Sequence, residues 1–191
     1  QGPYELRWVQ VPLRTAEQKA RGYAGGETGQ MGYAVAICPA DPNYLAIAID
    51  TAAVYITTDG ACSWHLKRRG IMSNGVQSLA FDPNNPHVLW AAGLKSSDSP
   101  DAPSDPVADG IYITRDGGES WQLLRNAVYL RRQAQNEYFT FDPDSFDGTQ
   151  CRTVYAGTHN DGVLKTTDAG GTWESLGFQN TVINAIVLHP M

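Results

Sequence analysis

One short motif occurs three times in this chain, first as Thr57-Thr58-Asp59-Gly60-Ala61-Cys62-Ser63-Trp64. Residues 114–121 read TRDGGESW and residues 166–173 read TTDAGGTW, so the shared pattern is Thr-x-Asp-x-Gly-x-Ser/Thr-Trp. The aspartates stand at positions 59, 116 and 168, which are 57 and 52 residues apart. Recurrence at such a spacing indicates a repeated structural unit of about 50 residues.

An apolar strand followed by proline precedes each copy of this motif. These strands end at Pro39, Pro83 and Pro143, and a fourth begins within residues 185–190 (AIVLHP). Proline suits a strand end because it has no N–H to donate to a neighbouring strand. A second strand is expected at 44–50, 88–93 and 153–158, a third at 54–57, 111–114 and 163–166, and a fourth from each motif tryptophan. Four short antiparallel strands per unit are typical of β-propeller blades, so the predicted fold class is all-β.

The motif has the residues that a tight turn between the third and fourth strands needs. An aspartate carboxylate can accept hydrogen bonds from N–H groups of its own turn, and glycine takes positive φ without a Cβ clash. The tryptophan is expected to bury its ring between neighbouring sheets. We therefore predict structural roles for the aspartates Asp59, Asp116 and Asp168, the glycines Gly118 and Gly170, and the tryptophans Trp64, Trp121 and Trp173.

The three motifs resemble the Asp-box (BNR) repeats of sialidases, sortilin-type receptors and several glycoside hydrolases. The resemblance covers residues 31–191 and implies β-propeller blades in which the motif aspartates are structural. The first copy departs from the pattern, because Ala61 stands where glycine is expected. We therefore expect the first turn to be distorted.

The repeat predicts one partial propeller over residues 1–191. Its blades are expected at about 31–67, 75–125 and 136–177, with single strands of a split blade at 4–13 and 181–188. Propellers have about 4–8 blades, so the remaining partners are expected to be other propeller blades. We expect these blades to belong to the same, longer protein; the alternative is that other chains complete the ring. Outside the strands, residues 15–21 (TAEQKAR) predict a helical turn.

Ligand-binding residues are expected on the rim opposite the aspartate turns, where the second strand connects to the third and the fourth strand to the next unit. The candidates are Arg68, Arg69, Arg131, Arg132, His159 and Asp161. The loop 95–109 lies on the same rim, and its four aspartates match no EF-hand spacing, so we interpret it as a solvated loop. The histidines are scattered and Cys-x-x-Cys is absent from the sequence, so no metal or cofactor is expected.

Asp50 is the candidate catalytic residue. Residues 25–55 are similar to the opening blade of xyloglucanase-type glycoside hydrolases, and this resemblance implies that Asp50 is a catalytic carboxylate. Ala52 and Ala53 replace the Gly-Gly pair of that family. Glycoside hydrolysis needs two carboxylates, and in that family the second comes from another propeller. The alternative is a strand-end aspartate bonded to loop amides.

Composition narrows the remaining function classes. The net charge is −6 and the pI is about 5.1, so a nucleic-acid partner is not expected, and apolar runs are too short for a membrane span. Cys38, Cys62 and Cys151 are expected to be buried or half-buried, with their redox state left open. The predicted function is a non-catalytic module that binds or scaffolds a protein or polysaccharide partner, outside the cytoplasm or secreted. The alternative is the N-terminal part of a xyloglucanase-like hydrolase.

Overall fold

The computed structural model describes residues 15–22, 32–49, 53–73, 75–93, 110–126, 138–158 and 161–189. The expected helical turn is present as α1 (Ala16–Ala20). Thr15 caps it, because its hydroxyl accepts from the Gln18 N–H while the Gln18 side chain accepts from the Thr15 N–H. The strand expected at 4–13 lies outside the described residues.

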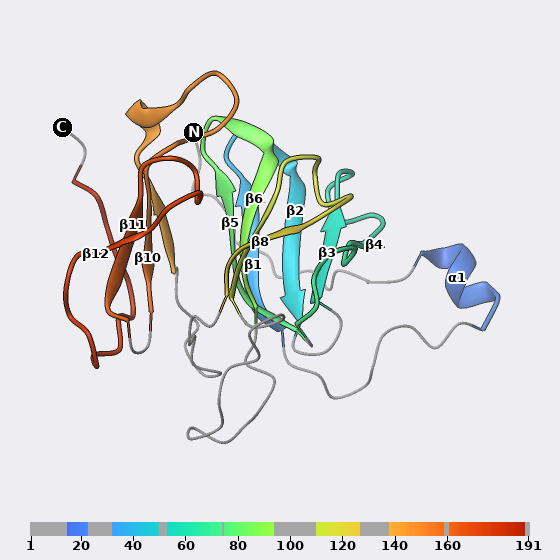
Figure 1. Cartoon of the computed structure of the whole chain (residues 1–191). Helices are drawn as coiled ribbons and strands as arrows, with labels where there is room; N and C mark the ends of the chain where they lie inside the picture. The colour runs from blue at the N-terminus through green and yellow to red at the C-terminus, as the bar shows by residue number, and fades with distance from the viewer. Residues whose placement is uncertain are drawn as a thin grey trace, which may run out of the picture.

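The rest of the described chain is dominated by three four-stranded antiparallel sheets, which confirms the predicted fold class (Figure 1). Sheet A contains β1 (Gly32–Cys38), β2 (Asp41–Ile49), β3 (Ala53–Thr57) and β4 (His65–Leu66). Sheet B contains β5 (Val76–Asp82), β6 (Asn85–Gly93), β7 (Gly110–Thr114) and β8 (Gln122–Asn126). Sheet C contains β9 (Phe139–Phe141), β10 (Val154–Gly157), β11 (Val163–Thr166) and β12 (Glu174–Ser175). The 3-10 helix η1 (Pro143–Ser145) follows β9.

The ends of the strands coincide with the prolines and with the residues of the repeated motif. β1 and β5 each stop at the residue before a proline, at Cys38 and Asp82. The third strands end at the motif threonine, and the fourth strands begin one residue after the motif tryptophan. Within each sheet the strands are hydrogen-bonded in sequence order, so every sheet is a simple meander.

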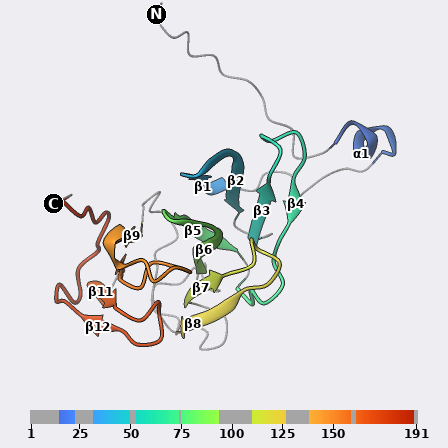
Figure 2. The same ribbon diagram turned by 90° about the horizontal axis from the view of Figure 1, so that it is seen from above.

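The sheets are stacked in the order A, B, C, with β1, β5 and β9 nearest one another, as the view from above shows (Figure 2). Alternate residues of a strand face opposite sides of a sheet. Between sheets A and B, Ala46, Val54 and Ile56 pack with Leu89 and Tyr112 of sheet B. Sheet B is therefore covered on this face by sheet A.

The second core lies between sheets B and C. It is built around Trp90, whose ring is fully buried and lies 5.8 Å from the ring of Phe139 and 5.9 Å from that of Trp173. Leu164 and Val154 complete it from sheet C. Burying an indole of about 200 Å² contributes at most about 5 kcal/mol at 25 cal/mol per Å². The sides on which neighbouring sheets face each other are thus apolar, and their contact stabilises the stack.

Residues 181–189 differ from the expectation of a strand at 181–188, because no strand is assigned there. This segment lies against sheet C. The Ile183 N–H donates to the Thr158 carbonyl at 2.9 Å, and the Thr140 hydroxyl donates to the Ile186 carbonyl at 2.5 Å. A strand needs a hydrogen-bonding neighbour along its length, and no described strand pairs with this segment.

The cysteines are all free thiols. Cys38 and Cys151 are buried, as expected, whereas Cys62 is exposed. The expectation for Cys62 is therefore wrong. The reason is its place in the aspartate turn between β3 and β4, at the edge of sheet A.

Candidate functional site

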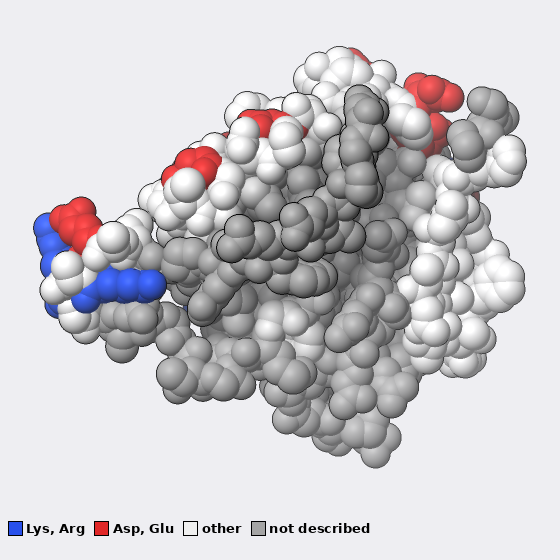
Figure 3. Space-filling view, turned by 180° about the vertical axis from the view of Figure 1, so that it is seen from behind, with Lys and Arg blue, Asp and Glu red and all other residues white. Residues whose placement is uncertain are grey.

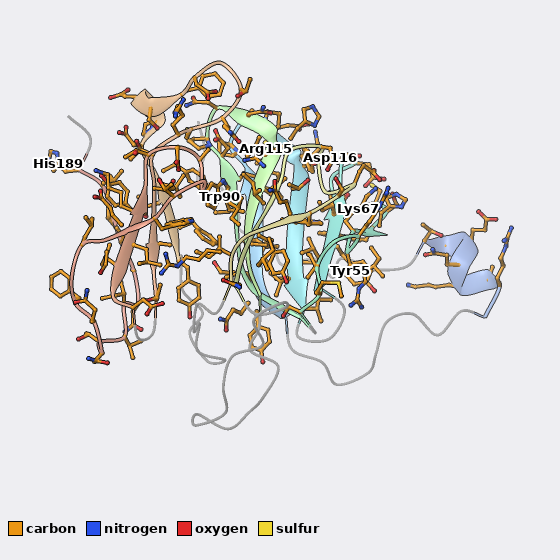
Figure 4. The ribbon with its side chains drawn as sticks, viewed as in Figure 1. Tyr55, Lys67, Trp90, Arg115, Asp116 and His189 are labelled. Carbon is orange, nitrogen blue, oxygen red and sulfur yellow. The ribbon has the colours of Figure 1, made fainter. Side chains whose placement is uncertain are left out.

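The register of the strands defines two ends of each sheet. In sheet C, Val154 pairs with Phe141 on one side and with Thr166 on the other, so these three residues lie at the same end. This end holds the aspartate turn and the connection from the first to the second strand, and we call it the turn rim. Figure 4 shows Arg115 and Asp116 at this end of sheet B. The view from behind shows patches of acidic side chains along the turn rim (Figure 3).

Each motif aspartate is held by the same three hydrogen bonds. Asp59 accepts from the Thr57 hydroxyl at 2.7 Å, the Ser63 N–H at 2.9 Å and the Ser63 hydroxyl at 2.6 Å. The same pattern joins Asp116 to Thr114 and Ser120, and Asp168 to Thr166 and Thr172. The threonine hydroxyl also accepts an N–H from four residues further on. These bonds use the oxygens of the carboxylate to close the turn.

Hydrogen bonds that stabilise the ionised form lower the pKa of the motif aspartates. The Ser63 hydroxyl and N–H, with the Thr57 hydroxyl, lower the pKa of Asp59 to about 2. The Thr172 N–H and hydroxyl, with the Thr166 hydroxyl, lower the pKa of Asp168 to about 2. Burial acts in the opposite direction on Asp116, but the bonds from Ser120 and Thr114 leave its pKa lowered.

The first turn is formed like the other two, so the expected distortion is wrong. Ala61 takes φ 72°, in the region that Gly118 and Gly170 occupy at 91° and 92°. A Cβ at Gly118 would lie 2.5 Å from Ile56 Cδ1 of sheet A, and a Cβ at Gly170 would lie 2.4 Å from Leu124 Cδ1 of sheet B. A Cβ at Gly118 or Gly170 would therefore press on the end of an aliphatic side chain of the preceding sheet, whereas Ala61 already carries a Cβ in the same backbone region.

The motif tryptophans hold neighbouring sheets together to different degrees. Trp121 is buried, and its indole N–H donates to the Lys67 carbonyl of sheet A at 3.1 Å. Trp64 is also buried, whereas Trp173 is half-buried and packs against Trp90. A salt bridge between Lys67 and Glu119 lies beside the Trp121 contact.

Of the predicted catalytic and ligand-binding residues, the structure describes Arg68, Arg69 and Asp161. Asp50, Arg131, Arg132 and His159 lie outside the described residues, as does the loop 95–109. Arg68 and Arg69 are exposed and follow β4, where the Arg69 carbonyl accepts from the Trp121 N–H at 2.8 Å. Asp161 is half-buried between β10 and β11 of sheet C. Sheet B therefore separates the two described arginines from Asp161.

A cavity of about 750 Å³ lies at the turn rim, beside sheet C. Sequence reasoning missed it. Its lining consists of residues from the end of β5, from β9 and its connection to β10, from β10, and from the C-terminal segment: Phe81, Pro83, Phe139, Thr140, Phe141, Asp142, Pro143, Asp144, Tyr155, Ile186, Val187, Leu188 and His189. Figure 4 shows His189 on this side of the molecule. The only sequence signal was the Asp-Pro-Asp run at 142–144, because the rest comes from segments distant in sequence.

Contacts between sheet B and the β9–β10 connection position the cavity wall. The carboxylate of Asp82 is buried and accepts from the Cys151 N–H at 2.5 Å. Asn84 donates to the Pro143 carbonyl at 3.0 Å, and Asn85 donates to the Thr149 carbonyl at 2.6 Å. Burial, with the adjacent charge of Asp82, raises the pKa of the Cys151 thiol to about 12. The thiol is therefore protonated near neutral pH.

The described part of the chain offers no grouping of metal ligands and no membrane-spanning helix. Within it, no group of three His, Cys, Asp or Glu side chains is placed to hold a metal ion. None of its helices has the length and apolar character needed to cross a membrane.

No protein-family model and no curated protein matches the chain. Among solved structures, the GH74 enzyme of Niastella koreensis gives a TM-score of 0.61 at 22% identity, over 82% of this chain and 24% of that enzyme. An ancestral GH74 enzyme gives 0.55 at 26% identity, over 76% and 18%. YCF48 from Cyanidioschyzon merolae gives 0.52 at 18% identity, over 88% and 40%. The fold is that of β-propeller blades. The chain spans less than half the length of each of these three proteins.

Proposed function

We propose that this chain consists of Asp-box propeller blades that bind a polysaccharide or protein partner without cleaving it. The observation that carries this proposal is the cavity of about 750 Å³ at the turn rim. Concave sites of about 300–1,000 Å³ with apolar walls and a few polar groups are typical of ligand sites. Phe81, Phe139 and Phe141 supply apolar wall, and Asp144 and His189 supply polar groups.

The Asp-box assignment is supported by the repeated turn. Three turns share one sequence pattern, one set of hydrogen bonds and one place between the third and fourth strands. The carboxylates of Asp59, Asp116 and Asp168 are used within the turns, so they serve the scaffold rather than a ligand.

The arrangement of carboxylates at the cavity supports binding without hydrolysis. Cleavage of a glycosidic bond normally requires two carboxyl groups that flank the bond from opposite sides. Asp142 and Asp144 line the cavity from one loop, and Asp142 accepts the Asp144 N–H at 3.1 Å. Two carboxylates on one side can accept hydrogen bonds from a ligand, which is a binding role.

A polysaccharide is the partner class that this lining favours. The half-buried rings of Phe141 and Tyr155 offer flat apolar surface, and the exposed Asp144 carboxylate can accept bonds from sugar hydroxyl groups. The similarity of the opening blade to xyloglucanases makes xyloglucan oligosaccharides the first probe to use.

Calorimetric titration with xyloglucan oligosaccharides, with a parallel assay for new reducing ends, tests this function. We expect binding without release of reducing ends. Asp144→Asn should weaken binding by about tenfold, which is the loss of one charge-assisted hydrogen bond. The matched control is Asp161→Asn on the opposite rim, which should leave the affinity unchanged. Weaker binding in Asp161→Asn together with unchanged binding in Asp144→Asn would contradict the cavity as the binding site.

The second candidate is part of a xyloglucanase-like hydrolase in which Asp50 is a catalytic carboxylate. The similarity of residues 25–55 to xyloglucanases and the 26% identity to an ancestral GH74 enzyme favour it. In this case xyloglucan cleavage by the longer protein should be lost in Asp50→Asn. Unchanged cleavage in that variant would rule out a catalytic role for Asp50.

A further inference from the structure

The first strand of sheet B contains a β-bulge at the end opposite the turn rim. Val76 of β5 pairs with Gly93 of β6, and Ser78 pairs with Ala92, so Gln77 is the extra residue between the two pairs. A bulge leaves its extra residue outside the ladder and changes the direction of a side chain, and bulges are frequent next to active sites. The bulge therefore marks Gln77 as a candidate binding residue.

The Gln77 side chain is buried, and its amide has no partner within the described part of the chain. Gln77 is 1% exposed, and neither its Nε2 nor its Oε1 atom forms a hydrogen bond with a described residue. The large majority of buried polar side-chain atoms have a hydrogen-bond partner. Since an amide carries both donors and an acceptor, its natural partner is a group that donates and accepts.

Neutral polar residues lie close to the bulge. A Cβ built on Gly93 would lie 3.1 Å from Ser73 Cβ and 3.0 Å from Tyr112 Cε2, so both side chains contact the strand opposite the bulge. The Ser73 hydroxyl donates to the Gly75 carbonyl at 2.9 Å. Ser73, Tyr112 and Ser78 are all buried. The residues around the amide therefore carry hydroxyl groups and no charge.

Sheet A has the same bulge at the equivalent position. The register of β1 with β2 shifts between Gly32 and Ala34, so Tyr33 is the extra residue. The Tyr33 Oη atom is buried and, like the amide of Gln77, forms no hydrogen bond with a described residue. β1 and β5 are neighbouring strands of the stack (Figure 2). Two adjacent blades thus place a neutral polar side chain at the same register position.

Gln77 belongs to the middle sheet of the stack. Sheet B packs against sheet A on one face and against sheet C on the other. A further blade at either end of the stack would pack against sheet A or sheet C, so it would not reach the bulge of sheet B.

We propose that the Gln77 amide binds one neutral hydroxyl group, carried by an ordered water molecule or by a bound ligand. A hydroxyl group both donates and accepts, and a buried water molecule makes about three hydrogen bonds to polar groups that lack other partners. A charged group does not suit the site, because a buried charge needs an opposite charge. The proposal does not depend on what the turn-rim cavity binds.

Nuclear magnetic resonance of the wild-type chain tests the site and separates the two sources of the hydroxyl group. We expect cross-peaks between the side-chain amide protons of Gln77 and a long-lived water molecule. Xyloglucan oligosaccharides are then added. Cross-peaks that move from water to the oligosaccharide would assign the hydroxyl to a ligand, and unchanged cross-peaks would assign it to water. Amide protons with neither cross-peak would overturn the proposal.

Thermal unfolding of Gln77→Met provides the second measurement. Methionine has a similar length and lacks the amide, so loss of the hydrogen bonds should lower the unfolding temperature by about 2–4 °C. The matched control is Gln122→Met at an exposed position of β8, which should change it by less than about 1 °C. An unfolding temperature of Gln77→Met equal to or above that of the wild type would show that the amide has no partner, and would overturn the proposal.

Discussion

The Cys151 N–H donates to the buried carboxylate of Asp82 at 2.5 Å, and the Cys151 thiol lies 3.3 Å from the other oxygen of the same carboxylate. These two residues are 69 positions apart and join β5 of sheet B to the β9–β10 connection of sheet C. The contact fixes the loop that carries Asp142 and Asp144 to the cavity. One buried aspartate therefore links the packing of two blades to the candidate binding site.

Asp82→Ala is expected to destabilise the chain by about 1–3 kcal/mol, because the buried Cys151 N–H loses its acceptor. Urea unfolding monitored by tryptophan fluorescence measures this change. The matched control is Asp144→Ala at an exposed position of the same loop, which should change stability by less than about 0.5 kcal/mol. Equal effects of the two variants would show that the Asp82 contact contributes nothing.

Gly118→Ala and Ala61→Gly are expected to act in opposite directions. Gly118 has φ 91° and its Cβ would lie 2.5 Å from Ile56 Cδ1, so alanine should cost about 2 kcal/mol. Ala61 has φ 72°, and glycine there relieves the left-handed backbone by about 1 kcal/mol. Thermal unfolding of both variants provides the measurement. Stabilisation by Gly118→Ala would contradict the packing of the second turn against sheet A.

Acid should lower the stability of the folded chain, because it protonates the carboxylates of the motif aspartates. The pKa values of Asp59 and Asp168 are lowered from 3.8 to about 2, so their contribution is present above about pH 4 and is lost as the pH falls toward 2. The unfolding temperature should therefore fall over this interval. In Asp168→Asn the unfolding temperature should fall less over this pH interval than in the wild type. An identical pH profile in wild type and variant would argue against a role for the ionised carboxylate.

Alkali should lower the stability of the folded chain, because three buried groups, two tyrosines and one cysteine, ionise more readily in the unfolded state. Burial is the main cause that raises the pKa of Tyr44, Tyr138 and Cys151 to about 12, from ordinary values of 10.0 for tyrosine and 9.0 for cysteine. The folded state then holds more protons than the unfolded state, so stability falls as the pH rises from about 9 to 12. Ultraviolet titration of tyrosinate should show that at least two tyrosines, Tyr44 and Tyr138, ionise late. Titration of every tyrosine near pH 10 would contradict their burial.

The sequence predicted the sheets well because their signals are local. The Pro-terminated strands, the motif threonines and the aspartate turns each need only neighbouring residues, and the third strand of sheet C is found at the predicted Val163–Thr166. The error at Ala61 arose because alanine adopts the positive φ of this turn, 72°, while the contacts that Gly118 and Gly170 make with the preceding sheet are not visible in the local pattern.

The candidate site was harder to predict from the sequence than the sheets were. The cavity combines Phe81, Tyr155 and Ile186, which lie in segments far apart in the sequence. Residues 181–188 are predicted to form a strand from their composition, but strand formation depends on a neighbour that the pattern does not reveal. The predicted binding positions Asp50, Arg131, Arg132 and His159 stay predictions.

Nuclear magnetic resonance titration of the chain with xyloglucan oligosaccharides tests binding at the turn-rim cavity, because it locates the binding site and detects cleavage in one sample. We expect the amide signals of Asp144, Tyr155 and Ile186 to shift on binding while the oligosaccharide stays intact. Shifts confined to residues around Asp161 on the opposite rim, or the appearance of cleavage products, would contradict binding without cleavage at the cavity.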